Sequence, residues 1–442
     1  MTPRFFALSF MAGIPAIAAS EVTFNKDVLP ILQKNCQGCH RPGEVAPMSL
    51  LTYSETRPWA KAIKAAVVKR EMPPWFADPA YHFANDRTLS AADITTLSTW
   101  ADGGATEGDA KDKPAPVSFP DGWNIKPDMV IEMPKEFHIA ASGTINYQNI
   151  LVKVNFPEDK WVVAAEMRPG NAKVLHHGRV IVRPPGSEWM AKAIPGEPYE
   201  TTSEAVGGSQ MGIDQLGKYN PGLGAQKFDV GGSAKFIAKG SDVVFNLHYT
   251  SVGTPQTDRS RVGLVFAKEP PRQRYWMSPG TPAAFNLAIP AGESNVEVVS
   301  EVTIGVDDAK LVYMQPHMHL RGKDYELRLI YPMGETQTVF KGKWNFEWQI
   351  GYQMEKPIPV PKGTRLRTIA HFDNSVNNRF NPDPTKLVLW GDQNWDEMQS
   401  GFIGLIFDVR TDIDKVFRPS GPSLLPRGKS GPSLEALAVA DR

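Results

Sequence analysis

Cysteine is nearly absent from this sequence, which has only two among 442 residues, Cys36 and Cys39. Two thiols three positions apart cannot cross-link a chain of this length, so a disulfide framework is excluded and the pair must have a local role. An excess of charge of one sign is also missing, because 48 basic residues balance 48 acidic ones. This balance provides no basic field for a nucleic acid, so no nucleic-acid partner is expected.

Long hydrophobic runs are missing as well. After residue 20, no apolar run approaches the ~20 residues that are needed to span a bilayer. Residues 1–20 read as a signal peptide, with a positive start at Arg4, an apolar centre over Phe5–Ile17 and small residues at Ala16-Ile17-Ala18. We therefore expect a periplasmic or secreted protein that is soluble after signal cleavage, or one held at the membrane only by an uncleaved signal.

Both cysteines belong to Cys36-Gln37-Gly38-Cys39-His40, which is the CxxCH pattern of covalent c-type haem attachment. Two thiols one helical turn apart reach the two vinyl groups of a haem, and the imidazole of His40 then lies under the iron. A redox CxxC with an incidental histidine is the alternative. Export and the lack of other cysteines favour one covalent haem, with His40 as its proximal ligand.

A thioether is expected on the other side of the iron, where it would raise the reduction potential. Met72 is the preferred candidate because Pro73-Pro74 fix the backbone directly after it, and Met48 is the alternative. Helical patterns over Val28–Lys34 and Arg57–Arg70 surround the motif, and a third opens at Ser90 and ends at Gly103-Gly104. These patterns predict a small all-α cytochrome c domain over residues 21–112.

The rest of the chain changes to short alternating apolar runs that are separated by turn residues. With 37 glycines and 38 prolines in the sequence, this pattern favours β-sandwiches. We expect a linker at residues 113–127, a first β-sandwich at 128–270 and a second at 271–420. A disordered tail is expected at 421–442, where proline, glycine and serine are frequent.

Five of the nine histidines form a pattern within the β-rich part. His317 and His319 follow the apolar run Lys310–Met314, and alternate residues of a strand project from the same face. His176-His177 stand at the start of one predicted strand and His248 lies within another. Met398 precedes a strongly apolar strand. Three imidazoles form a site for copper in either oxidation state, whereas two imidazoles and a thioether favour Cu(I).

At this point the sequence resembles a known family, the type II copper, ascorbate-dependent monooxygenases, which include the peptidylglycine α-hydroxylating enzymes and dopamine β-monooxygenase. The ordered motifs His-His, His-Tyr, His-x-His and Glu-Met carry the resemblance, which covers roughly residues 128–409. Tyr219-Asn220-Pro221-Gly222 resembles the loop that precedes the third histidine in the family. The N-terminal part resembles the small c-type cytochromes that bacteria fuse to other redox modules.

The resemblance implies two jelly-roll-like sandwiches that face each other across a solvent cleft. It implies that His176, His177 and His248 hold an electron-storing copper, and that the catalytic copper is held by His317, His319 and Met398. It further implies O₂, a small-molecule substrate that is hydroxylated at a C–H bond, and a reductant, either ascorbate-like or a redox protein. We expect the haem to pass electrons from an external donor to the coppers.

The chain also departs from the family. It has no cysteines for the disulfides of the animal enzymes. Gln315, Ser400 and Phe402 stand where the amidating enzymes use arginine, asparagine and tyrosine to hold a peptide carboxylate, so peptide amidation is not predicted. Two alternatives to a monooxygenase stay open: a non-catalytic electron-transfer or copper-binding protein, and a structural β-protein without metal.

Overall fold

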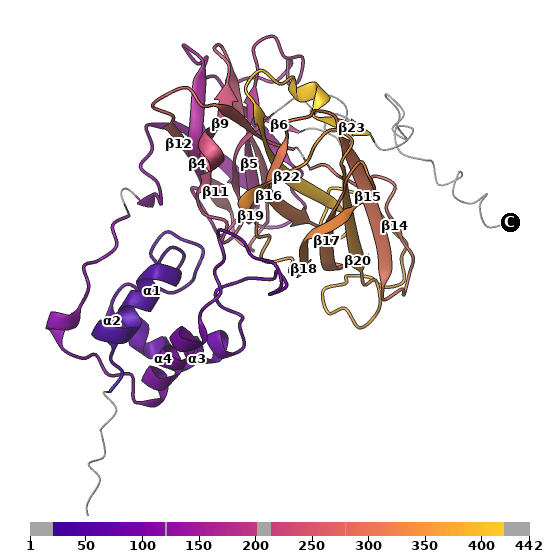
Figure 1. Ribbon diagram of the computed structural model, residues 1–442. Coiled ribbons are helices and arrows are strands. Elements are labelled where there is room, and N and C mark those ends of the chain that lie inside the picture. The colour runs from indigo at the N-terminus through magenta and orange to yellow at the C-terminus, as the bar shows by residue number, and fades with distance from the viewer. Residues whose placement is uncertain (1–20, 120–121, 201–213, 279, 420–442) are drawn as a thin grey trace, which may run out of the picture.

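A computed structural model describes residues 21–119, 122–200, 214–278 and 280–419. Within these ranges the protein consists of a small N-terminal lobe with short helices and a much larger β part (Figure 1). None of the described helices has the length and apolarity to cross a membrane. The predicted signal peptide and the predicted tail at 421–442 lie outside the described residues.

The N-terminal lobe contains four short α-helices and packs around one small core. Its helical elements are η1 (Phe24–Val28), α1 (Leu29–Asn35), α2 (Tyr53–Thr56), η2 (Arg57–Trp59), α3 (Ala60–Val68), α4 (Ala91–Asp102) and η3 (Ala110–Asp112). Phe24, Leu32, Leu97 and Trp100 are fully buried in the core. The third predicted helix is confirmed as α4, because Ser90 caps its first turn and Gly103 follows its last residue.

The prediction of a small all-α domain is wrong. The helix expected over Arg57–Arg70 is divided, because Pro58 lies in a separate 3₁₀ turn, and only α3 and α4 exceed seven residues. The chain between α3 and α4 contains no helix and leaves the lobe. Phe83, 4% exposed, joins the core of the second sandwich and forms a bridge with Met354. Residues 75–87 are therefore a strap on the β part rather than part of a helical domain.

The strands of the β part pair almost entirely in antiparallel fashion, with β13 and β9 as a parallel pair. In chain order the strands are β1 (Met129–Glu132), β2 (Phe137–Ile139), β3 (Gln148–Val152), β4 (Lys160–Arg168), β5 (Leu175–Arg183), β6 (Pro198–Glu200), β7 (Gln215–Tyr219), β8 (Gln226–Lys227), β9 (Ser233–Ile237), β10 (Asp242–Tyr249), β11 (Gln256–Asp258), β12 (Arg261–Phe266), β13 (Gln273–Met277), β14 (Ala288–Ile289), β15 (Val296–Ile304), β16 (Lys310–His317), β17 (Gly322–Ile330), β18 (Thr336–Lys343), β19 (Tyr352–Pro359), β20 (Arg365–Phe372), β21 (Val388–Leu389), β22 (Ser400–Asp408) and β23 (Phe417–Pro419).

One long sheet runs through both sandwiches, in the order β1-β12-β4-β9-β13-β22-β16-β19, with β8 beside β4. The five-stranded sheet β6-β3-β10-β5-β7 belongs to the first sandwich, and the five-stranded sheet β18-β17-β20-β15-β23 belongs to the second. The expectation of two sandwiches that face each other across a solvent cleft is therefore wrong, because a continuous sheet joins them.

Strand β22 shows why the two cores meet at the shared sheet. Phe402 and Ile406 pack into the first core, whereas Ile403, Leu405 and Phe407 pack into the second. Side chains of a strand alternate between the faces of its sheet, so an uninterrupted apolar run serves a core on either side. The shared sheet thus holds elements of both sandwiches, and their histidines, in fixed positions.

Candidate metal centre

The first histidine group, His176, His177 and His248, is assembled by the pairing of β5 with β10. His177 lies directly opposite His248, whereas the next pair along the ladder is Leu175 with Tyr249. His176 is therefore the extra residue of a β-bulge. Adjacent residues of a regular strand point to opposite faces, and a bulge redirects one of them. As a result, one ligand atom of each histidine lies within 4.8 Å of the others.

Contacts between the rings organise this first group further. The Nδ1 atom of His248 lies 3.1 Å from Nε2 of His177, and the Tyr147 hydroxyl lies 3.2 Å from the same Nε2. The Tyr147 ring also stacks on His248, with 4.6 Å between centroids. Phe346, from the loop between β18 and β19, stacks on His176. A loop of the second sandwich thus covers histidines that are held by two strands of the first sandwich.

The His-x-His group, as the sequence predicts it, consists of His317, His319 and Met398. His317 is the last residue of β16, and His319 lies in the loop that follows. The prediction that both histidines lie on one strand is therefore wrong. The two rings are nevertheless neighbours, with 5.2 Å between centroids. The Nδ1 atom of His317 lies 2.8 Å from Oε1 of Gln349, and Nδ1 of His319 lies 3.4 Å from the Asp396 carbonyl oxygen. The contact of His317 leaves its Nε2 atom available to bind a metal, as in metal-binding histidines.

Glu397 joins the loop that carries His319 to the segment that carries Met398. Its buried carboxyl accepts hydrogen bonds from the backbone N–H groups of His319 at 2.8 Å, Arg321 at 2.6 Å and Met398 at 3.1 Å. Burial raises the pKa of Glu397 to about 8, although these donors and the Arg321 charge act in the opposite direction. One side chain therefore brings the Met398 backbone beside that of His319.

The two groups lie next to each other. The rings of His177 and His317 are in edge-to-face contact, with 6.3 Å between centroids. The five imidazoles therefore form one continuous cluster, and no solvent cleft separates the expected copper sites.

Burial keeps the cluster uncharged. It lowers the pKa of His248 and of His317 to about 3, and it lowers the pKa values of His176, His177 and His319. Neutral imidazoles are the form that binds a metal. The Nδ1 atom of His176 is buried and has no hydrogen-bond partner among the described residues, which indicates a missing ligand. The donor set therefore fits copper or zinc.

Several residues around the cluster escaped the sequence analysis because they carry no ligand signature. Tyr147, Gln349 and Glu397 contact the candidate ligands from distant parts of the chain. Glu397 is the exception that a motif could have indicated, since it forms the Glu-Met pair with Met398. Lys218 is fully buried: its Nζ donates to Oε1 of Gln315 at 2.8 Å and lies 3.2 Å from the ring centroid of Phe402.

The remaining histidines lie apart from the cluster. His138 on β2 is exposed, and neither it nor His82 contacts the candidate ligands in any recorded interaction. His371 on β20 binds Asp324 on β17, with 2.7 Å between Nδ1 and the carboxylate, and it lies 3.6 Å from a carboxylate oxygen of Glu297. The structure places His371 beside two carboxylates of the second sandwich.

The CxxCH motif forms a turn after α1. The N–H groups of Cys39 and His40 both donate to the Cys36 carbonyl oxygen, at 3.0 and 2.9 Å. Both thiols are free, and Nδ1 of His40 is buried without a partner among the described residues. Met48 packs against the lobe core, as Cys36 does, whereas the chain after Met72 turns towards the β part. The motif thus offers two thiols and an imidazole to a haem.

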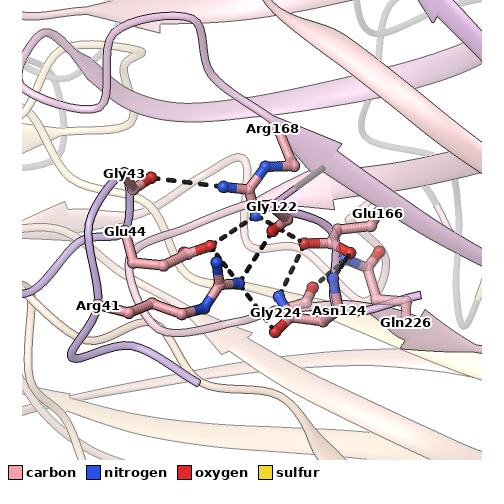
Figure 2. A network of polar contacts seen from close by, with 9 residues as sticks. All are labelled: Arg41, Gly43, Glu44, Gly122, Asn124, Glu166, Arg168, Gly224 and Gln226. Atoms are coloured by element: carbon pink, nitrogen blue, oxygen red, sulfur yellow. Dashed lines mark hydrogen bonds and ion pairs between the residues drawn. The ribbon is translucent and has the colours of Figure 1, made fainter. Parts of the chain in front are cut away.

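The lobe is fixed to the first sandwich by a buried network of charged groups (Figure 2). Glu44 accepts from Arg41 at 2.7 Å and from Arg168 of β4 at 2.6 Å, and Arg168 also pairs with Glu166 at 3.1 Å. Asn124 donates to Glu166 through its backbone N–H and its side chain. Since every charge in this network has a partner of opposite sign, it can hold the CxxCH turn in place.

Comparisons with known proteins do not assign the chain to a family. No protein-family model matches it, and no curated protein does. Among solved structures it is similar to the major capsid protein P2 from bacteriophage PM2, with a TM-score of 0.29 and 9% identity over 63% of this chain and 97% of that chain. It is also similar to the STIV MCP, with a TM-score of 0.28 and 8% identity over 63% and 94% of the two chains. Scores this low support no inference on fold or function.

Proposed function

We propose that this protein is an exported copper-dependent monooxygenase that hydroxylates a C–H bond of a small molecule and receives its electrons through a c-type haem. The single observation that carries the proposal is the convergence of five histidines from β5, β10, β16 and the loop after β16 into one cluster. Three of these imidazoles are buried and two are half-buried, and a protein without a metal has little reason to withdraw neighbouring imidazoles from water, because each loses hydration.

The chain's own contribution is to fix donor atoms before the reaction. Copper, when bound, supplies one-electron redox chemistry with O₂. Gln349 holds the His317 ring so that Nε2 is its free nitrogen, and Glu397 holds the backbone of His319 and Met398. Burial of His317 and His319 excludes water around them. Fixed donors in a dry site are what the protein adds to metal chemistry.

The electron balance explains why two groups and a haem motif occur in one chain. Insertion of one oxygen atom of O₂ into a C–H bond, with the other leaving as water, needs two electrons and two protons from outside the substrate. Two copper ions can each store one electron, and the haem iron can pass on one at a time from an external redox protein. The contact between His177 and His317 provides a short connection between the two groups.

A non-catalytic electron-transfer or copper-binding protein is the second candidate. The observation that favours it is the low exposure of three of the five histidines, with His248 at 4%, His317 at 8% and His319 at 2%. A carrier needs only electrons to reach its metal, whereas an oxygenase must admit a substrate.

Elemental analysis of the purified holoprotein is the first test. The proposal expects two copper ions and one iron per chain. Iron without copper would overturn it and leave an exported haem protein, and the absence of both metals would support a structural β-protein.

The second test separates catalysis from transport. With ascorbate as reductant, isotopically labelled O₂ and a panel of small aromatic and aliphatic compounds, mass spectrometry should detect a product that contains one labelled oxygen. Met398→Ala should abolish this product and keep the copper at the first histidine group. Met333→Ala is the matched control, since Met333 is 91% exposed on the second sandwich. A wild-type protein that binds both coppers but incorporates no label would instead be a carrier.

The third test concerns the haem. The haem is reduced in a stopped-flow instrument without any small reductant, and the loss of the Cu(II) signal is followed. The proposal expects copper reduction on the timescale of turnover. Copper that stays oxidised while the haem is reduced would remove the haem from the electron route.

A further inference from the structure

A cavity lies between the CxxCH turn and the first sandwich. One wall is formed by Gly38, Cys39 and Gly43, and the other by Met167 and Tyr219. The charged network of Figure 2 lies along the same interface, since Glu44, Glu166 and Arg168 also line the cavity. The cavity therefore separates the candidate haem attachment site from the strand that pairs with β5.

The hydroxyl group of Tyr219 is buried and has no hydrogen-bond partner among the described residues. Burial raises the pKa of Tyr219 to about 12, and the charges of Glu44 and Arg168 and the Cys39 thiol act on the same hydroxyl. The group therefore lies close to these cavity residues. A buried hydroxyl without a partner is rare in a folded protein and indicates an absent acceptor.

The charge around the cavity shows which acceptor would fit. Arg41 and Arg168 are balanced by Glu44 and Glu166. Arg87, on the strap, adds a further positive charge: it donates to the carbonyl oxygens of Gly222 and Leu223 and acts electrostatically on Cys39. Unlike Arg41 and Arg168, Arg87 has no carboxylate partner among the described residues and bonds only to carbonyl oxygens, so its positive charge is unpaired. An anionic acceptor such as a carboxylate compensates it.

Tyr219 also links this cavity to the first histidine group. Its backbone pairs with Gly178, which directly follows His177. Met167, on the same cavity wall, packs closely on Gly178. A Cβ added at Gly178 would lie 2.6 Å from the terminal methyl carbon of Met167. The wall of the cavity is thus one residue away from the cluster.

We propose that Tyr219 is a positioning residue for the haem and that its hydroxyl donates a hydrogen bond to a haem propionate carboxylate. This inference rests on the proposed covalent haem at Cys36 and Cys39. The hydrogen bond holds the edge of the haem against the first sandwich, on the side that leads to His177. It also partly neutralises a negative charge near the iron, which favours the reduced haem.

The test is Tyr219→Phe, with Tyr331→Phe as the matched control. The Tyr331 hydroxyl donates to Gln337 on the second sandwich, away from the cavity. The equilibrium of the haem with a redox dye of known potential should shift towards oxidised haem in Tyr219→Phe. The shift should stay below the roughly tenfold that the whole energy of one hydrogen bond to a charged group would give, because the bond is present in both oxidation states. Electron transfer from haem to copper should also slow. The control should match the wild type in both measurements.

The outcomes separate this inference from the proposed function. Haem content is measured first by the absorbance of the denatured haem, and a wild type without haem overturns the proposed haem itself. Equal haem content with an unchanged dye equilibrium and an unchanged transfer rate in Tyr219→Phe overturns the role of Tyr219 alone. The variant should fold, because phenylalanine has nearly the same shape and the removed hydroxyl has no partner within the described protein.

Discussion

The two ligand groups of the cluster are supported in different ways. In the first histidine group, strand pairing sets the positions of the histidines, and Nε2 of His177 contacts both the His248 ring and the Tyr147 hydroxyl. In the His-x-His group, Gln349 contacts the His317 ring and the Asp396 carbonyl oxygen contacts the His319 ring. Glu397 holds the backbone of the loop that carries His319.

The difference shows two routes to a preorganised site. A sheet ladder fixes ligand positions through many cooperative backbone bonds, so no single side chain is essential for the framework of the first group. A loop has no ladder, and the His-x-His group depends on a few buried polar contacts whose loss leaves unsatisfied donors. Breaking each support in turn therefore tests the comparison.

The largest effect is expected from removal of a ligand. His248→Ala should lose the copper of the first histidine group and keep that of the His-x-His group. His319→Ala should lose the copper of the His-x-His group and keep that of the first, because each variant leaves the unchanged group with its full donor set. Elemental analysis and electron paramagnetic resonance would measure the remaining ion. His138→Ala, at an exposed position, is the control and should keep both coppers. Loss of both coppers in either variant would show one joint site instead of two.

The next largest effect is expected from the support of the loop. Glu397→Ala leaves three buried backbone N–H groups without an acceptor, and should lower the free energy of unfolding by ~3–5 kcal/mol. Chemical denaturation measures this change. Glu301→Ala is the control: its ion pairs with Arg365 and Arg367 are partly exposed, so the change should stay within ~1 kcal/mol. Similar losses in the two variants would refute the special role of Glu397.

A smaller effect should follow from loss of ring orientation. Gln349→Ala should weaken copper binding at the His-x-His group by roughly 10–100-fold, because the hydrogen bond to His317 Nδ1 fixes the orientation of the ring. Tyr147→Phe should weaken the first group less, since strand pairing still positions His177 and His248. Copper titration against a competing chelator compares the two. Equal losses would contradict the proposed difference between strand and loop.

The smallest effect is the pH dependence of the metal-free protein. The pKa values of His248 and His317 are about 3 when folded, so the unfolded chain takes up protons below pH ~6.5 while the folded protein does not. Stability should therefore fall as the pH drops from ~6.5 towards 3, by up to ~1.4 kcal/mol per pH unit for each histidine.

Glu397 opposes this trend, because its folded pKa of about 8 lies above the ordinary value and stabilises the folded protein as the pH falls from 8 to ~4.5. Two histidines against one carboxyl leave a net loss between pH 6.5 and 4.5. Urea unfolding at several pH values measures the slope, and His248→Gln should flatten it. A stability that rises on acidification would show that the histidines are not buried as neutral rings.

Much of the strand pattern was readable from the sequence, because alternation of apolar residues is a local signal. Strands β10 (Asp242–Tyr249) and β12 (Arg261–Phe266), for example, are short apolar-rich segments of the sequence. The expected all-α domain failed for a non-local reason. Residues 75–87 contact the second sandwich, some 260 positions further along the chain. A local sequence pattern cannot predict a contact between segments so far apart.

The sequence by itself determined which donor types are present, the CxxCH spacing and the order of the histidine motifs, because these depend only on neighbours along the chain. Only the tertiary structure decided that His176 sits on a bulge, that Glu397 joins two loops, and that His177 touches His317. These arrangements arise from strand register and from a sheet shared by two cores. Both depend on contacts between distant segments, which no local sequence pattern encodes.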